Sequence, residues 1–411
     1  MIAVDNDRPA AREFDRLSER VLTIAGVYGP NASGKSNVLD ALAWLSAAVE
    51  VSLRTWREFI PREPHRFGDG EEAPSTFEIE MIVQGVRYVY RLEADEFEVH
   101  FEGLYSYPER RRRVLFEREG LDIGFRRGLG GLAGTRELLT PTTLALSAAM
   151  RFGEPEVQPF GRRLAGIGTL GLRGLASWRR QAELDRRPAS STERLFGLRE
   201  HYDQPDPPGN AQASPADRDS ALALLRFADL GIDDVQLVHD EDGRPPSGST
   251  REGRRRLRFL HRAGGEELPF DLAEESAGTQ TWFRLIGPAL DALGRGQVLI
   301  FDEIDASLHP RLSARLLELF QDPQTNPLGA QLIFSTHDTS LLNSMNRDEV
   351  WLTEKNEDGS TTLTALAEYG GDKVRRSLNL EKAYLQGRFG AVPDLDQFML
   401  RRALGLALGE P

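Results

Sequence analysis

Residues 29–36 read Gly-Pro-Asn-Ala-Ser-Gly-Lys-Ser, and this octapeptide constrains the fold more than any other stretch of the chain. The apolar run at 21–28 predicts a buried strand before it, and residues 37–45 carry apolar side chains at helical spacing after it. A glycine-bounded loop between strand and helix, closed by Lys-Ser, is the context of a phosphate-binding P-loop. The glycines let backbone N–H groups turn toward phosphate oxygens, and the helix N-terminus adds partial positive charge.

The lysine of this loop is unusual for the chain, because the composition strongly favours arginine. The chain holds 51 lysines and arginines, yet lysine occurs only at Lys35, Lys355, Lys373 and Lys382. A compact ammonium at position 35 predicts contact with the β- and γ-phosphates of ATP and a catalytic role, and the Ser36 hydroxyl would ligate Mg²⁺. The predicted nucleotide contacts of this loop are Gly29, Asn31, Ala32, Ser33, Gly34, Lys35, Ser36 and Asn37.

A second group of candidate site residues follows the apolar run at 298–301. Asp302 and Glu303 come directly after it, which is a Walker B pattern. A parallel central strand is covered on both faces and therefore needs such an apolar run. We expect Asp302 to hold Mg²⁺ together with Ser36, and Glu303 to act as the catalytic carboxylate that polarises the attacking water.

Upstream of this strand, Ser276, Gly278 and Gln280 open a predicted helix at 281–293. A hydroxyl, free backbone N–H groups and the positive end of the helix dipole make such a start suitable for phosphate. We therefore assign these three residues to nucleotide binding. By itself the pentapeptide also fits a plain helix cap, so that reading stays open.

Downstream of the Walker B pair, Asp305 lies where a D-loop belongs, and we assign it to the nucleotide site. His337 follows the apolar run at 331–336, which predicts another core strand. A histidine in this place can contact the γ-phosphate, and we expect His337 to be catalytic. The order of the motifs along the chain supports this assignment more than the lone histidine does.

Composition limits the remaining possibilities. The chain of 411 residues has 40% hydrophobic residues and a net charge of −13, and it contains no cysteine. Disulfides and zinc ribbons are therefore excluded. The net charge argues against a surface that binds nucleic acid throughout, although local contact stays possible. We find no signal peptide and no apolar run long enough to span a bilayer, so a cytoplasmic protein without a membrane partner is expected.

Periodicity predicts the organisation of the rest of the chain. A β-hairpin is expected at 77–83 and 86–92 around Gln84-Gly85, with further alternation at 98–101 and 114–117 that extends it into an antiparallel meander. Helical patterns are expected at 10–20, 38–59 and 135–185, a proline-rich connection at 186–220, and strands at 256–260 and 267–270.

Together these motifs resemble the ABC/SMC-like AAA-type ATPases of bacterial abortive-infection and related defence systems. This family is related to the RecF and Rad50 repair proteins and to the ATPase half of overcoming-lysogenization-defect nucleases. The resemblance rests on the segments at 29–37, 274–280, 298–310, 335–338 and 381–393. Residues 1–20 lack the aromatic-rich strand pair with which such proteins usually begin, so the adenine contacts and the Q-loop are not assigned.

The resemblance implies an α/β P-loop NTPase fold of the ABC-ATPase head type, with an antiparallel β subdomain and a helical insertion. It implies an ATPase lobe at 1–175 that contains the P-loop and a meander at 76–127, an insertion at 176–255, and a second lobe at 256–411. It also implies a homodimer, or a higher oligomer, in which the segment at 276–280 serves the ATP of the opposite subunit.

The ending at 381–393 resembles that of RloA-type ATPases, which implies pairing with a TOPRIM-containing effector and a role in antiphage defence. Tyr384, Arg388 and Phe389 are predicted to dock that partner, although packing on the ATPase's own core fits their composition equally well. A RecF-like DNA-repair clamp is the alternative function. A transporter subunit is disfavoured by the meander, and a built-in nuclease by the 74 residues (411 − 337) after His337, where Asp394 and Asp396 fit a helix N-terminus.

Overall fold

The computed structural model describes residues 1–5, 8, 10–14, 17, 19–172, 191–198, 215–228, 231–239, 255–306, 308–369 and 379–391. A six-stranded sheet of order β16-β15-β3-β14-β13-β9 lies at its centre. Its neighbours pair in parallel except β15 and β16, which form an antiparallel hairpin. The strands are β3 (Ile24–Tyr28), β9 (Gly168–Leu170), β13 (Val298–Phe301), β14 (Gln331–Ser335), β15 (Val350–Lys355) and β16 (Thr361–Ala365).

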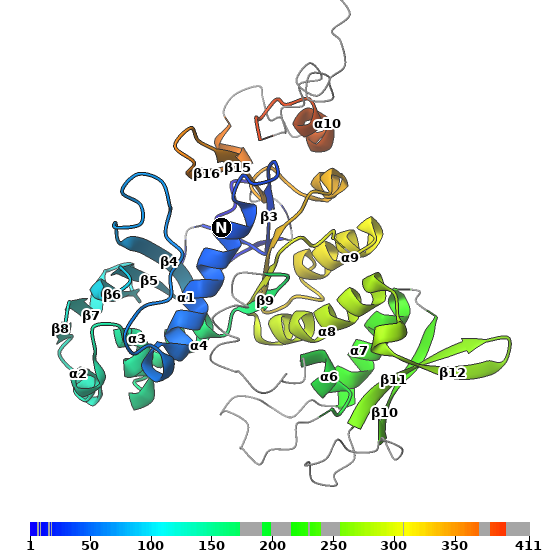
Figure 1. Ribbon diagram of the computed structural model, residues 1–411, viewed down its shortest axis with the longest axis horizontal. Helices are drawn as coiled ribbons and strands as arrows, with labels where there is room; N and C mark the ends of the chain where they lie inside the picture. The colour runs from blue at the N-terminus through cyan, green and yellow to red at the C-terminus, as the bar shows by residue number, and fades with distance from the viewer. Residues whose placement is uncertain are drawn as a thin grey trace, which may run out of the picture.

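The central strands feed two hydrophobic cores, one on each face of the sheet. In β13, Leu299 and Phe301 enter one core, whereas Val298 and Ile300 enter the other. This alternation follows from the two-residue period of a strand. One face is covered by α1 (Lys35–Thr55), and the other by α8 (Ala277–Arg295) and α9 (Pro310–Gln321), as Figure 1 shows.

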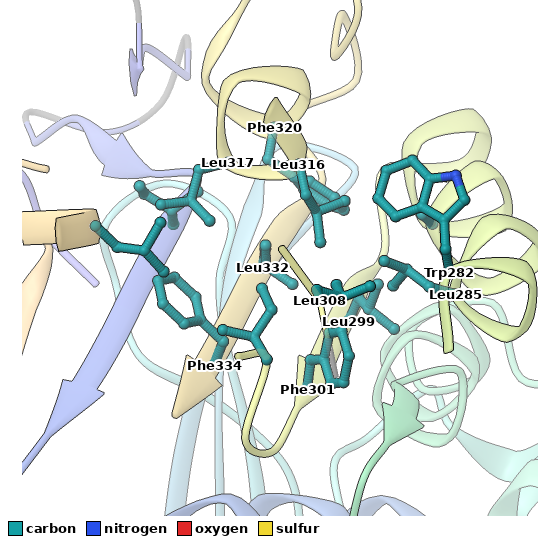
Figure 2. Packing of buried hydrophobic residues seen from close by; sticks show 14 of the residues in the cluster. Trp282, Leu285, Leu299, Phe301, Leu308, Leu316, Leu317, Phe320, Leu332 and Phe334 are labelled. Carbon is teal, nitrogen blue, oxygen red and sulfur yellow. The ribbon is translucent and has the colours of Figure 1, made fainter. Parts of the chain in front are cut away.

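Figure 2 shows the core between the sheet and the helices α8 and α9. Its labelled side chains are Trp282 and Leu285 of α8, Leu316, Leu317 and Phe320 of α9, Leu299 and Phe301 of β13, Leu332 and Phe334 of β14, and Leu308 of the connecting loop. A parallel sheet buried on both faces by helices is the α/β architecture that the sequence predicted.

The predicted antiparallel meander is confirmed as a five-stranded sheet beside α1. Its strands are β4 (Ser75–Val83), β5 (Val86–Ala94), β6 (Val99–Tyr107), β7 (Arg113–Glu119) and β8 (Asp122–Phe125). Gln84 and Gly85, between β4 and β5, have φ angles of 51° and 74°. Positive φ at both central residues is what a two-residue hairpin turn of this type requires.

A buried ion pair of the meander also forms hydrogen bonds with the segment at 140–146, which leads into a neighbouring helix. The side chains of Glu102 and Arg118 are both 0% exposed and lie 3.7 Å apart. The Glu102 carboxylate accepts hydrogen bonds from the Tyr90 hydroxyl (2.9 Å) and from two N–H groups at the start of α3 (Ala145–Ala149; 2.5 and 2.7 Å). Arg118 donates to the carbonyl of Thr140 (2.8 Å). Both buried charges are thus satisfied, as a stable interior requires.

Two expectations about secondary structure are wrong. The region expected to be helical at 135–185 contains β9, an edge strand of the central sheet, besides α2 (Thr135–Leu138), α3 and α4 (Gln158–Ala165). Three residues are too few to display a strand period. Near the N-terminus, β1 (Ala11–Arg12) pairs antiparallel with β2 (Val21–Leu22), where a helix was expected. A strand pair is therefore present before the P-loop.

The remaining elements lie mainly on the α8 side of the sheet. They are α6 (Ser191–Leu195), α7 (Pro215–Phe227), and an antiparallel sheet of β10 (Ile232–His239), β11 (Arg255–Ala263) and β12 (Glu266–Asp271). The last two confirm the strands predicted at 256–260 and 267–270. Much of the predicted insertion at 176–255, and Asp394 and Asp396, lie outside the described residues. Within the part of the chain that is described, no helix is long and apolar enough to cross a membrane.

The segment at 379–391 packs on the core of its own chain. Helix α10 (Leu380–Leu385) contacts the 3-10 helix η4 (Thr339–Ser344). Tyr384 and Phe389 are 7% and 2% exposed and belong to the same hydrophobic core as α8 and α9. The prediction that these two aromatic side chains dock a partner is wrong, because they fill the interior of their own chain. Arg388 remains exposed.

Candidate nucleotide-binding site

Side chains of β15 and β16 lie so close to the loop between β3 and α1 that two positions of this loop have room only for glycine. Gly34, which begins α1, has φ 100°, and a Cβ there would lie 2.2 Å from the Thr361 hydroxyl oxygen. At Gly29 a Cβ would lie 2.3 Å from the Thr353 hydroxyl oxygen. The motif glycines are thus required by backbone conformation and by the close approach of β15 and β16.

Lys35 folds over this loop. Its side chain is buried, and Nζ donates hydrogen bonds to the carbonyl oxygens of Gly29 (2.9 Å) and Pro30 (3.0 Å). Burial lowers the pKa of the ammonium, while the carboxylates of Asp302, Glu303 and Asp305 act in the opposite direction. The predicted P-loop lysine therefore lies near enough to the predicted acidic residues for their charges to act on its ammonium group.

The other predicted P-loop residues differ in exposure. Asn31, Ala32 and Asn37 are exposed, and Ser36 is half-buried in the first turn of α1. Ser33 is buried, and its polar groups bind other parts of the chain. Its hydroxyl lies 2.6 Å from that of Thr353, and its carbonyl accepts a hydrogen bond from the Thr361 hydroxyl (2.9 Å). Ser33 thus joins the P-loop to the β15–β16 hairpin.

The two Walker B residues follow β13 and form hydrogen bonds with the neighbouring strand, β14. Asp302 is 6% exposed, and its Oδ1 accepts a hydrogen bond from the hydroxyl of Ser335 at the end of β14. The same hydroxyl accepts the N–H of Glu303 (2.8 Å). Glu303 has φ 52°, a left-handed conformation that is uncommon for a residue with a side chain. The backbone is therefore bent at the residue expected to be catalytic.

Asp305, at the predicted D-loop, and His337 are joined within one chain. Asp305 Oδ1 accepts hydrogen bonds from the Thr336 hydroxyl (2.7 Å) and from the backbone N–H of His337 (3.1 Å). The His337 residue itself is exposed. The carboxylate of Asp305, which was predicted to contact nucleotide, thus accepts hydrogen bonds from the two residues that follow β14.

Ser276, Gly278 and Gln280, which were also predicted to bind nucleotide, lie at the start of α8. Ser276 caps α8, since its hydroxyl accepts the N–H of Thr279 (3.1 Å), and the Gln280 amide donates to the carbonyl of Glu275 (2.9 Å). Gly278 lies in the first turn of the same helix. Helix α8 and helix α1 cover opposite faces of the sheet. Among the described residues, no hydrogen bond connects 276–280 with 29–37.

Two residues next to the site were missed by sequence reasoning. Ser335 was recognised only as part of the segment at 335–338, although its hydroxyl binds both Walker B residues. Asp40 lies one helical turn after Ser36, and burial, followed by the charges of Asp302 and Glu63, raises its pKa to about 6. The i, i+4 spacing from Ser36 was the signal that could have found it.

A protein-family model described as "AAA domain, putative AbiEii toxin, Type IV TA system" matches residues 24–343. The chain belongs to this family. The matched range runs from β3 through η4 and so includes the P-loop, both Walker B carboxylates and His337. The protein is accordingly an AAA-type ATPase with the P-loop NTPase fold of the ABC-ATPase head type.

Solved structures of SMC head domains are also similar to this chain. One is an SMC head bound to the C-winged helix domain of ScpA, with 15% identity, coverage of 86% of this chain and 94% of that chain, and a TM-score of 0.40. Another is the SMC head domain from Thermotoga maritima, with 12% identity, coverage of 86% and 96%, and a TM-score of 0.32. A search of curated proteins found no match to the sequence.

The residues at the P-loop fit a nucleoside triphosphate with a divalent cation. The glycine positions leave no room for side chains, and the buried ammonium of Lys35 supplies a positive charge. Asp302, held by Ser335, and Ser36 supply the hard oxygen ligands that Mg²⁺ prefers.

Proposed function

We propose that the protein binds Mg-ATP at the P-loop and hydrolyses it. The observation that supports this most is the position of Lys35, a buried ammonium over the loop with three carboxylates in electrostatic reach. A phosphate chain needs such a cation, and a divalent ion needs such carboxylates.

Each predicted residue has a distinct role in this proposal. Ser36 and Asp302 would hold Mg²⁺, which when bound neutralises charge on the β- and γ-phosphate oxygens. Glu303, at the bend after β13, would take a proton from the attacking water. His337, which is exposed just after β14, would contact the γ-phosphate and stabilise the charge that develops there.

The test is calorimetry with Mg-ATP on matched lysine variants. Lys35→Ala should abolish binding, because only backbone dipoles would remain to offset the phosphate charge. Lys382→Ala, at an exposed position on α10, is the control and should bind as the unaltered protein does. Equal ATP affinity in both variants would refute the assignment of the P-loop.

We further propose that two chains close around two nucleotides. Ser276 is exposed at the start of α8, and α8 covers the face of the sheet opposite to α1, the helix that follows the P-loop. A helix N-terminus with accessible N–H groups suits the phosphates of another copy of this chain. The hydrolysis site would then be complete only in the dimer.

An effector protein and a role in antiphage defence complete the proposal. The family description, which names a putative toxin of a toxin–antitoxin system, supports a defence role. The RloA-like ending suggests a TOPRIM-type effector, now with the exposed Leu385 and Arg388 as its contact in place of the buried aromatic residues. Replacing both with Glu should spare ATP hydrolysis and abolish co-purification with the product of the neighbouring gene. Strong stimulation of hydrolysis by duplex DNA alone would favour the RecF-like alternative.

A further inference from the structure

The β15–β16 hairpin forms one wall of the P-loop. Thr353 and Thr361, one on each strand, contact Ser33 through its hydroxyl and its carbonyl, at 2.6 and 2.9 Å. In the sheet, β15 lies on one side of β3, whereas β14 and β13 lie on the other. The hairpin and the Walker B carboxylates therefore flank the P-loop from opposite sides.

A second segment approaches the P-loop on the hairpin side. After α1 ends, the chain turns back along this helix: the Trp44 indole donates a hydrogen bond to the carbonyl of Pro61 (2.5 Å), and Glu63 lies within electrostatic reach of Asp40. Trp44 and Asp40 are successive turns toward the helix N-terminus. The loop thus runs from the middle of α1 back toward the phosphate-binding turn.

This loop places Phe67 against the tip of the hairpin. A Cβ on Gly359 would lie 2.8 Å from the Phe67 ring, and Gly359 is two residues from Thr361, which contacts the P-loop. Phe67 is nevertheless 64% exposed. The exposed ring of His65 lies beside it, with centroids 5.6 Å apart. Two exposed aromatic rings therefore lie at the tip of the hairpin whose Thr361 contacts the P-loop.

The carboxylates on one side of the P-loop indicate how a bound nucleotide would be oriented in the site. With Ser36 and Asp302 as the residues that would hold Mg²⁺ at the terminal phosphates, the γ-phosphate end would face Asp302, toward β13. The nucleoside then leaves the P-loop on the opposite side, which is the side of the hairpin and the loop at 61–70. We infer that Phe67, supported by His65, is the platform on which the base of the bound nucleotide stacks. This inference rests on the proposed binding of ATP.

Stacking has a consequence for selectivity. Every nucleobase offers an aromatic face, so a platform of this kind tolerates different bases, while hydrogen bonds to base edges would discriminate among them. The site should therefore accept GTP and CTP as well as ATP, with affinity that follows stacking strength.

The experiment compares Mg-ATP with Mg-tripolyphosphate, which has phosphates but no base, by calorimetry. Phe67→Ala should weaken ATP binding by about 10- to 100-fold, the usual contribution of one stacked base, and leave tripolyphosphate binding unchanged. Phe67→Trp should retain ATP affinity, since it keeps an aromatic face. Phe227→Ala is the control, because Phe227 is 55% exposed on α7 at the other face of the sheet.

The outcomes separate this inference from the function on which it rests. Unchanged ATP affinity in Phe67→Ala, or an equal loss for ATP and tripolyphosphate, overturns the stacking platform even when Lys35→Ala loses both ligands. Unchanged binding of both ligands in Lys35→Ala overturns the P-loop assignment itself. A loss confined to ATP in Phe67→Ala, recovered in Phe67→Trp, supports the platform.

Discussion

The hydroxyl of Ser335 donates a hydrogen bond to the carboxylate of Asp302 and accepts one from the N–H of Glu303. One side chain at the end of β14 therefore orients both residues that follow β13. Such outer partners of metal-binding carboxylates fix ligand geometry and contribute strongly to metal affinity. We therefore expect Ser335 to be a positioning residue for Asp302 and Glu303 in the proposed reaction, one that need not touch the nucleotide.

Ser335→Ala should lower ATP turnover and raise the Mg²⁺ concentration needed for half-maximal activity. Loss of an outer-shell partner typically costs about 10- to 100-fold in metal affinity or activity. Ser335→Thr keeps the hydroxyl and should recover part of both. The measurement is the ATPase rate over a Mg²⁺ titration. An unaltered Mg²⁺ dependence in Ser335→Ala would show that Asp302 does not hold the ion.

Glu303→Gln should keep the shape of the side chain and lose its basicity. We expect turnover to fall by about 10²-fold or more, a common contribution of a positioned base, while ATP still binds. Trapped ATP should also hold two chains together, which light scattering with Mg-ATP would detect. Wild-type hydrolysis rates in this variant would remove Glu303 from its proposed role.

His337→Ala should also lower turnover by about 10²-fold or more, because it removes a group that stabilises charge on the γ-phosphate. The same ATPase assay measures this loss.

Ser276→Arg should leave ATP binding largely intact and block hydrolysis, because the bulky cation would obstruct the site of the opposite subunit. Mixing this variant with Lys35→Ala should restore part of the activity, since one of the two interfacial sites would then have both intact halves. The measurement is the ATPase rate of the mixture against each variant alone. No recovery in demonstrated heterodimers would contradict the composite site.

Glu349 should make folding stability depend on pH. Its side chain is 0% exposed, and burial raises its pKa to about 7 despite Arg8 at 3.4 Å. The folded protein thus keeps a proton that the unfolded chain releases near its ordinary pKa of 4.5. The free energy of unfolding should therefore fall as pH rises from about 4.5 to about 7.

Glu349→Gln should remove this slope and raise the free energy of unfolding at pH 8, relative to wild type, by on the order of 2 kcal/mol. Urea unfolding at pH 5 and pH 8 measures the difference. Glu357→Gln, at an exposed position, is the control and should follow the wild type. The same pH dependence in Glu349→Gln and wild type would exclude Glu349 as its source.

Sequence patterns predicted the elements whose signals are local. The P-loop needs eight consecutive residues, and the meander needs only alternation and the Gln84-Gly85 turn. The contacts of Ser335 and Asp305 could not be predicted in this way, because they arise from pairing between β13 and β14, whose partners lie about 30 residues apart in sequence. Strand β9 was missed because three residues carry no period. Composition also could not decide whether Tyr384 lies inside the protein or on its surface.

The bend at Glu303 links folding stability to chemistry. Its φ of 52° lies in the region that glycine adopts freely and that other residues enter at about 1–2 kcal/mol. A glycine there would let the chain fold more easily but would have no carboxylate to offer the reaction. In the proposed role of Glu303, stability and hydrolysis would therefore favour different residues at this position, and Glu303→Gly is the substitution expected to stabilise the fold while removing activity.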